Sequence, residues 1–231
     1  MYDVLAKYYD ELVKDLDSTK RWHDFVLKHA TGKYLLDIAC GSGDLTIALS
    51  NSYKVDACDI SEEMLEIAVN KSKGLDINYF KNNMIDLKIS KNYDIITCFC
   101  DSINYILDLD EVKKVFIDVY NMLNNDGTFI FDIHSINRLE EFKDEFFETG
   151  EFNDITYEWS IESIDDMLYH NFIFFDKESH REFEQHVQKI YEPNFIKKML
   201  TDIGYNVSIF TDFDLIDIQD GEKYFFVCRK D

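Results

Sequence analysis

The chain has 231 residues, the length of one large domain or of one domain that carries an insertion. Hydrophobic residues make up 46% of it, enough to fill a core, so the composition excludes a disordered chain. The formal net charge is −22, and a field of that sign repels nucleic acids and anionic membrane surfaces. The N-terminus lacks a secretory signal, and no apolar run approaches the roughly 18 residues that cross a bilayer. We therefore expect a soluble cytoplasmic protein.

Two helical patterns of apolar residues come first, from 4 to 16 and from 22 to 29, and Gly32 ends the second. Short apolar runs then alternate with amphipathic stretches of helical length. The runs are Tyr34–Cys40, Lys54–Ile60, Ile77–Phe80, Tyr93–Phe99 and Thr128–Ile133. Strands that are apolar throughout are typical of a sheet that helices cover on both faces. The pattern predicts a doubly wound, mostly parallel α/β sheet.

The pattern changes at about residue 150. Three long aromatic-rich strands follow, at Ile155–Ser163, Met167–Asp176 and His180–Tyr191. Their connections are so short that they must form antiparallel hairpins. We expect this antiparallel insertion to occupy residues 135–192.

The last part of the chain returns to the first sheet. Pro193 starts a helix that ends at Gly204, and strands at Tyr205–Phe210 and Lys223–Arg229 form a final hairpin. Residues 1–134 and 193–231 are therefore predicted to build one seven-stranded core.

The strongest local motif is the segment Leu35–Asp44, in which a buried strand runs into a glycine turn and then a helix. Glycines let the backbone approach a ligand closely, and ligands of such sheets bind at the carboxyl ends of strands. A dinucleotide fingerprint would require a third glycine where Thr46 stands. Asp37 suits a cationic ligand group, and Asp59 can accept hydrogen bonds from ribose hydroxyls. A ribose without pyrophosphate, beside a cation, describes S-adenosylmethionine.

The segment Leu35–Thr46, followed by Asp59, resembles the first two motifs of class I S-adenosylmethionine-dependent methyltransferases. Further segments resemble a bacterial small-molecule or uncharacterised subgroup that carries an antiparallel insertion. These segments are Tyr8–Asp10, Asn83–Leu87, Asp101–Tyr105 and Gly127–His134. The match covers residues 2–134 by motif and the remainder by layout. It implies a Rossmann-like methyltransferase fold, with methyl transfer from S-adenosylmethionine to a nitrogen or oxygen atom of a small molecule by in-line displacement, leaving S-adenosylhomocysteine.

The resemblance also implies which residues bind the cofactor. Gly41 and Gly43 would face its methionine part, Asp59 its ribose, and Asn83 with the Met84 backbone its adenine. The full implied set is Tyr9, Trp22, Asp37, Ala39, Gly41, Gly43, Asp59, Ile60, Met64, Asn83, Met84 and Asp101. Two positions depart from the family pattern, which usually has glycine at 39 and often aspartate at 83.

His134, Asp101 and Tyr105 are the candidate catalytic residues. His134 follows the fifth strand at the ligand-binding edge, and an ordinary histidine pKa of about 6.5 suits proton transfer at neutral pH. A base is needed only when the acceptor is a hydroxyl or a protonated amine. His170, His180 and His186 reach this edge only if the insertion folds over it. No His, Cys and Asp spacing is typical of a metal site, so we expect no metal.

Structural alternatives remain for most of these residues. The glycines can form only a tight turn, and Asp59 can cap the helix that begins near Ser61, although Ser61 is the better cap. Asp101 and Asn104 can be turn residues, and His134 can be a histidine hydrogen-bonded at a strand–loop junction. Core positions are the alternative for Trp22 and for one of the two tyrosines at 8 and 9, and Trp159 is expected on the covered face of the small sheet.

Three other functions compete with small-molecule methylation. RNA or protein methylation keeps the chemistry, but the paired lysines at 113–114 and 197–198 form no basic strip for RNA. A nicotinamide oxidoreductase conflicts with Thr46. A cofactor-binding module without catalysis is the third. We expect no nucleic-acid or membrane partner, and a monomer or a homodimer.

Overall fold

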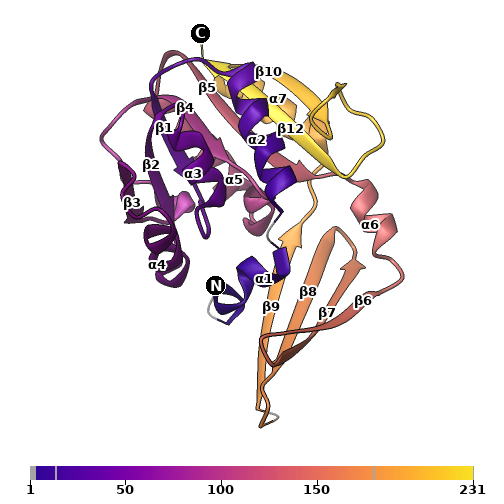
Figure 1. Cartoon of the computed structure of the whole chain (residues 1–231). Helices are drawn as coiled ribbons and strands as arrows, with labels where there is room; N and C mark the ends of the chain where they lie inside the picture. Colours follow the sequence, from indigo (N-terminus) through magenta and orange to yellow (C-terminus); the bar gives the residue numbers. More distant parts are fainter. Residues whose placement is uncertain (1–3, 14, 179, 231) are drawn as a thin grey trace.

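The computed structural model describes residues 4–13, 15–178 and 180–230, so the predicted bounds at residues 1, 2 and 231 lie outside the described residues. Its strands form two sheets (Figure 1), the larger in the order β11-β10-β12-β5-β4-β1-β2-β3. The strands of this larger sheet are β1 Tyr34–Ile38, β2 Lys54–Asp59, β3 Ile77–Lys81, β4 Tyr93–Cys98, β5 Leu123–His134, β10 Tyr205–Thr211, β11 Leu215–Ile216 and β12 Lys223–Lys230.

Strands β1 to β5 pair in parallel, whereas β12, β10 and β11 join them antiparallel along one side. The doubly wound, mostly parallel sheet predicted from the sequence is confirmed. All seven predicted strands are present, and the two-residue β11 adds an eighth.

Helices cover both faces of the larger sheet. They are α2 Leu16–His29, α3 Asp44–Ser50, α4 Glu62–Lys71, α5 Leu109–Met122 and α7 Pro193–Ile203. Alternate residues of β1 face the two layers, Leu35 toward α2 and α3 and Leu36 toward α5 and α7. Helix α5 buries a stripe of side chains that includes Val112 and Phe116, and α4 lies against β2 and β3. None of the described helices has the length and apolarity that a membrane crossing requires.

The first predicted helical pattern, from residue 4 to residue 16, is not one helix. The structure has a short 3-10 turn, η1 (Leu5–Lys7), and a short helix, α1 (Tyr9–Val13). A new helix, α2, then begins because the Asp15 side chain accepts hydrogen bonds from the first backbone N–H groups of that helix. Leu16 therefore belongs to α2, where it is exposed.

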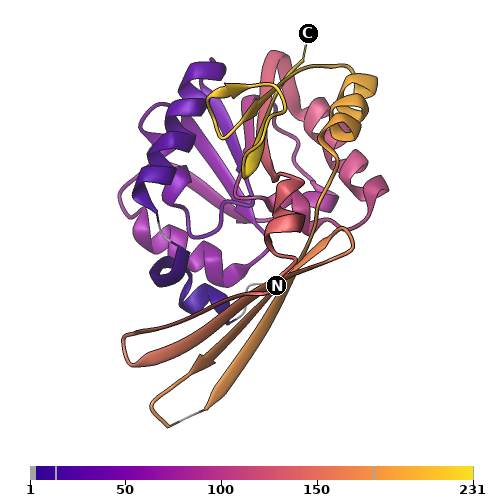
Figure 2. The same cartoon turned by 90° about the vertical axis from the view of Figure 1, so that its right-hand side faces the viewer.

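The second sheet contains four antiparallel strands in the order β6-β7-β8-β9 and projects away from the larger sheet (Figures 1 and 2). Its strands are β6 Phe146–Phe152, β7 Ile155–Ile164, β8 Met167–Phe175 and β9 Arg181–Lys189, preceded by the short helix α6 Asn137–Glu141. Strands β7, β8 and β9 match the prediction. The sequence analysis missed β6, an edge strand that leaves most of its residues exposed and so lacks the alternating pattern of a half-buried strand.

One face of the second sheet is covered by the N-terminal segment, defined here as residues 4–13. Leu5 is buried against Phe172 and Phe174 of β8, and the Tyr8 ring packs 4.5 Å from that of Phe174. Trp159 lies on this covered face, as expected. The division of the chain into a core and an insertion at residues 135–192 stays a prediction.

Candidate active site

A cavity of about 170 Å³ opens where β1 and β2 end, at the edge where ligands of doubly wound sheets bind. Ile38, Ala39, Asp59, Ile60, Asn82, Asn83, Met84, Ile85, Tyr105 and Ile106 line it. Six of these are among the predicted site residues: Ala39, Asp59, Ile60, Asn83, Met84 and Tyr105. The structure thus brings together residues that the sequence spreads over more than sixty positions.

The glycine turn after β1 has the left-handed backbone that glycine favours, with φ of 54° at Gly41 and 84° at Gly43. The two glycines differ in their surroundings. A Cβ atom on Gly43 would lie 2.8 Å from Cβ of Ala68, so Gly43 lets α4 pack against the turn. A Cβ atom on Gly41 would meet nothing within 4 Å. The space beside Gly41 is therefore available to a ligand.

Asp59 ends β2 and joins the glycine turn to the start of α4. Its Oδ2 accepts the N–H of Gly41 at 2.9 Å and its Oδ1 accepts the N–H of Ser61 at 2.9 Å. Ser61 caps α4, as predicted, by accepting the N–H of Met64 through Oγ. Burial raises the pKa of Asp59, although these hydrogen bonds oppose the shift. A carboxylate offers about four acceptor positions, so capacity remains for ligand hydroxyls.

Asn83 and Met84 also line the cavity. The Asn83 side chain accepts the N–H of Ile85 at 3.0 Å and so caps η2 (Met84–Asp86). Ile60 is 39% exposed at the mouth of the cavity. Adjacent backbone groups and an apolar rim suit a flat heterocycle.

Asp37 lies beneath the glycine turn and is not a lining residue of the cavity. It accepts hydrogen bonds from the hydroxyls of Thr46 at 2.6 Å and Thr97 at 2.7 Å. Burial raises the pKa of Asp37 to about 6. In this structure the residue ties α3 and β4 to β1, so it supports the turn from below.

A buried ionic cluster lies next to the cavity, after β4 and at the end of β5. Lys223 of β12 donates to Oδ2 of Asp101 and lies 3.6 Å from Oδ2 of Asp132. Asp132 also accepts the Asp101 backbone N–H at 2.9 Å and the Trp22 indole N–H at 3.2 Å. Burial raises the pKa of Asp132 to about 6. For Asp101, contacts with His134 and Lys223 outweigh burial and lower the pKa.

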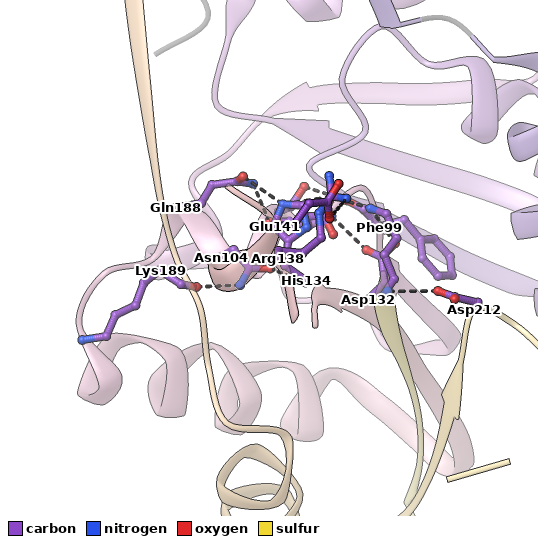
Figure 3. A network of polar contacts seen from close by, with 12 residues as sticks. Phe99, Asn104, Asp132, His134, Arg138, Glu141, Gln188, Lys189 and Asp212 are labelled. Carbon is purple, nitrogen blue, oxygen red and sulfur yellow. Dashed lines mark hydrogen bonds and ion pairs between the residues drawn. The ribbon is translucent and has the colours of Figure 1, made fainter. Parts of the chain in front are cut away.

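His134 closes this cluster at the end of β5, and Gln188 reaches it from β9 (Figure 3). Gln188 Nε2 donates to the Asp101 carbonyl at 3.3 Å, so its Oε1 is the atom that lies 3.0 Å from His134 Nε2. An amide oxygen only accepts, so Nε2 of His134 carries the proton and Nδ1 carries the lone pair. Nδ1 is buried and has no partner among the described residues.

Burial lowers the pKa of His134 to about 4, so the ring is neutral at pH 7. A neutral ring with a free Nδ1 lone pair is a good hydrogen-bond acceptor and a weak base. It would not repel a positive charge nearby. The geometry favours orientation of a bound group over removal of a proton from it.

The second sheet folds over this edge, which is the condition under which His170 and His186 could reach it. Burial lowers the pKa of His170 to about 4, and the neighbouring His134 and His186 rings add to this shift. His186 packs edge-on against the Tyr105 ring, with the ring centroids 5.7 Å apart. His180, in contrast, is exposed in the turn between β8 and β9.

The remaining predicted residues lie around the cavity without lining it. Tyr9 of α1 is half-buried, and burial together with the nearby Cys100, Tyr105 and Asp101 raises its pKa. Trp22 packs on Phe213 and is bound to Asp132. Met64 is buried in α4.

The sequence analysis missed Lys223, Asp132 and Gln188 as site residues. Asp132 had a signal, because it is a single charge in the apolar strand Thr128–Ile133. Lys223 and Gln188 had none, since each comes from a strand far along the chain. Asn104, for which the sequence also allowed a turn residue, links η3 (Ser102–Tyr105) to both sheets by accepting the His134 N–H and donating to the Lys189 carbonyl (Figure 3).

Within the described part of the chain, no group of three or more His, Cys, Asp or Glu residues could hold a metal ion.

Comparisons with known proteins agree with this geometry. A family model described as a methyltransferase domain matches residues 35–127. A protein of Geobacillus sp. (strain WCH70), named a putative methyltransferase, is 34% identical and covers 99% of both chains. The crystal structure of a S-adenosylmethionine-dependent methyltransferase from Clostridium acetobutylicum superposes with a TM-score of 0.86, at 31% identity, over 99% of this chain and 98% of that chain. A demethylmenaquinone methyltransferase from Symbiobacterium thermophilum is 30% identical over 56% of each chain.

Proposed function

The chain belongs to the class I S-adenosylmethionine-dependent methyltransferases, and from this premise we propose that it methylates a nitrogen or oxygen atom of a small molecule. The observation that carries the proposal is the cavity beside Asp59. Tyr105, which lines this cavity, is the last residue of the 3-10 turn η3, and Asp101 of the buried cluster immediately precedes the same turn. Demethylmenaquinone methyltransferases among the relatives support a small-molecule acceptor.

The residues of the cavity fit S-adenosylmethionine. Asp59 has acceptor positions left for the two ribose hydroxyls, Asn83 and the Met84 backbone border an apolar slot for the adenine, and Gly41 leaves room for the methionine part. When bound, this cofactor supplies a methyl group that is already activated on a positively charged sulfur.

The protein then has to align the acceptor and keep water out, since in-line displacement at an activated methyl group needs little else. We assign the acceptor to Asp101 and His134. Nδ1 of His134 accepts a hydrogen bond from the acceptor group and so directs the lone pair of that group toward the methyl carbon. The Asp101 carboxylate stabilises the positive charge that develops on the acceptor atom. Gln188 holds the His134 ring in the tautomer that this requires.

Calorimetric titration tests the cofactor site. We expect wild-type protein to bind S-adenosylmethionine and to ignore NAD. Asp59→Ala should raise the dissociation constant about tenfold or more, because a lost hydrogen bond to a charged group costs about 1.5–3 kcal/mol. Asp56→Ala is the matched control, since Asp56 lies three residues earlier on β2 and binds Lys91 and Tyr93 outside the cavity.

Equal affinity in the Asp59 variant would remove this residue from the site. Preferential binding of NAD would contradict the proposed function. Transfer of labelled methyl groups to protein or RNA, with none to small molecules, would replace the acceptor class and leave the cofactor site intact.

A further inference from the structure

Five buried polar atoms near the end of β5 have no partner among the described residues, and one of them, Nε of Arg138, belongs to a guanidinium that is bound to Glu141. The other four are Oδ1 of Asp101, Nδ1 of His134, Nε1 of Trp159 and Nε2 of His170. Asp101 and His134 are only 8% and 7% exposed. A buried polar atom without a partner is costly, and folded proteins contain few of them. Four such atoms around one edge indicate a binding site for a polar molecule.

The two pairs of atoms come from different sheets, and His170 lies close enough to His134 and Asp101 for both groups to affect its pKa. His170 pairs in register with His186 on β9, and Gln188, two residues further on the same face, bonds to both His134 and the Asp101 carbonyl. The Trp159 ring stacks on the His170 ring, with centroids 6.3 Å apart and planes inclined by 26°. The covered face of the second sheet therefore lies against Asp101 and His134.

We propose that these four atoms bind the methyl acceptor and that Trp159 and His170 are specificity-determining residues, selecting a small amine that carries a second polar group and no anionic group. This inference rests on the proposed function and specifies its substrate class.

The charges around the space favour an amine over an anion. Asp101 and Asp132 bring two carboxylates to it, and Lys223 is already bound to both. The other nearby cation, Arg138, is paired with Glu141 at 2.6 Å. A phosphate or carboxylate placed beside Oδ1 of Asp101 would lie next to a like charge in a poorly solvated position. A neutral amine instead donates its hydrogens to Asp101 and to Nδ1 of His134. The Trp159 N–H donates to a hydroxyl or carbonyl group elsewhere on the same molecule.

The chemistry of the transfer step agrees with this arrangement. The lone pair of the amine forms the new nitrogen–carbon bond while the electrons of the broken sulfur–carbon bond stay on sulfur. The positive charge thus moves from sulfur to nitrogen, next to the Asp101 carboxylate. The product ammonium then loses its proton to solvent as it leaves the site.

Matched small probes test the site directly. Crystals of the protein with S-adenosylhomocysteine are soaked separately with ethanolamine, with phosphoethanolamine and with propane-1,2-diol. We expect ethanolamine between Asp101, His134 and Trp159, and neither of the other two probes there. Phosphoethanolamine bound in that place, or no ethanolamine there, would overturn the inference. Absence of S-adenosylhomocysteine from the Asp59 cavity would instead overturn the proposed function.

Substitutions in the second sheet separate a binding role from a structural one. Trp159→Phe keeps the stacked ring and removes the N–H, and His170→Leu removes both ring nitrogens. By saturation-transfer NMR, each should weaken ethanolamine binding at least tenfold while the dissociation constant of S-adenosylhomocysteine stays unchanged. His180→Leu, at the exposed end of the same sheet, is the control and should change neither. Unchanged ethanolamine binding in both site variants would show that Trp159 and His170 only pack the sheet.

Discussion

At the scale of single residues, Lys223 is the cation that lets two carboxylates share one buried position. It contacts Oδ2 of Asp101 and of Asp132, and its ammonium lies 5.8 Å from the centroid of the Trp22 ring. Burial alone would lower the pKa of Lys223, but the two carboxylates hold the pKa above its usual value. The lysine therefore stays charged and keeps Asp101 ionised beside His134.

Removing this cation should leave an uncompensated buried charge. We expect Lys223→Met to lower the free energy of unfolding by about 3–5 kcal/mol, measured by urea denaturation. Adding Asp132→Asn to that variant should restore part of the loss, because one of the unpaired carboxylates is then neutral. Strictly additive effects in this double-mutant cycle would show that Lys223 and Asp132 are not coupled.

At the scale of elements, the N-terminal segment joins the second sheet to the glycine turn. Oε2 of Glu184 on β9 accepts the N–H groups of Val4 at 2.6 Å and Leu5 at 3.0 Å. At the other end of the segment, Asp10 accepts a hydrogen bond from Ser42 in the turn and pairs with Lys71 of α4. One short segment thus connects the cofactor edge to the sheet that covers the proposed acceptor site.

Glu184→Ala should release one end of this connection, because two backbone donors lose their acceptor. We expect a loss of about 1–3 kcal/mol in stability and faster hydrogen exchange at residues 4–13, with exchange in β1 and β4 unchanged. The control is Glu182→Ala, which removes a half-exposed ion pair with Lys7 and a long hydrogen bond from the Tyr8 hydroxyl at 3.4 Å, and should cost less than about 1 kcal/mol. Equal exchange in the two variants would count against a special role for Glu184.

At the scale of the whole molecule, buried groups of opposite kind give the stability opposing pH dependences. His134 and His170 have pKa values of about 4 against an ordinary 6.5, so the unfolded chain binds more protons and stability falls as pH drops from 6.5 toward 4. Asp37 and Asp132 have pKa values of about 6 against an ordinary 3.8. The stability that these two protonated carboxyl groups contribute is fully present below pH 3.8 and is lost as pH rises through 6.

Two variants should separate these contributions. The free energy of unfolding of His134→Gln, relative to wild type, should be about 2 kcal/mol more favourable at pH 5 than at pH 7. The reason is that the variant has no buried histidine that resists protonation. The free energy of unfolding of Asp37→Asn, relative to wild type, should be about 1 kcal/mol more favourable at pH 7 than at pH 5. The reason is that the variant has no buried carboxyl group that ionises as pH rises. Urea unfolding at the two pH values measures both. Changes of the same sign in both variants would contradict the assigned burial.

The sequence by itself determined the doubly wound sheet, the glycine turn, the Ser61 cap and the position of Asp59 beside the turn. Each of these depends on a short stretch of chain. Apolar runs specify buried strands, a glycine with positive φ specifies a turn, and the carboxyl ends of parallel strands necessarily share one edge. Strand β6 was not predicted, because an exposed edge strand carries no alternating pattern.

Only the tertiary structure decided how the acceptor side of the site is built. Lys223 contacts Asp101 although the two are 122 positions apart in the sequence, and Gln188 contacts His134 across 54 positions. Such contacts have no local signature, because the sequence around a polar strand residue does not show which distant residue it will contact in the packed structure. The second sheet covers Asp101 and His134 through side chains that the periodicity marks only as one face of a strand. Burial sets the protonation of His134, and charged contacts set that of Asp101 and Lys223. Both are properties of the assembled fold.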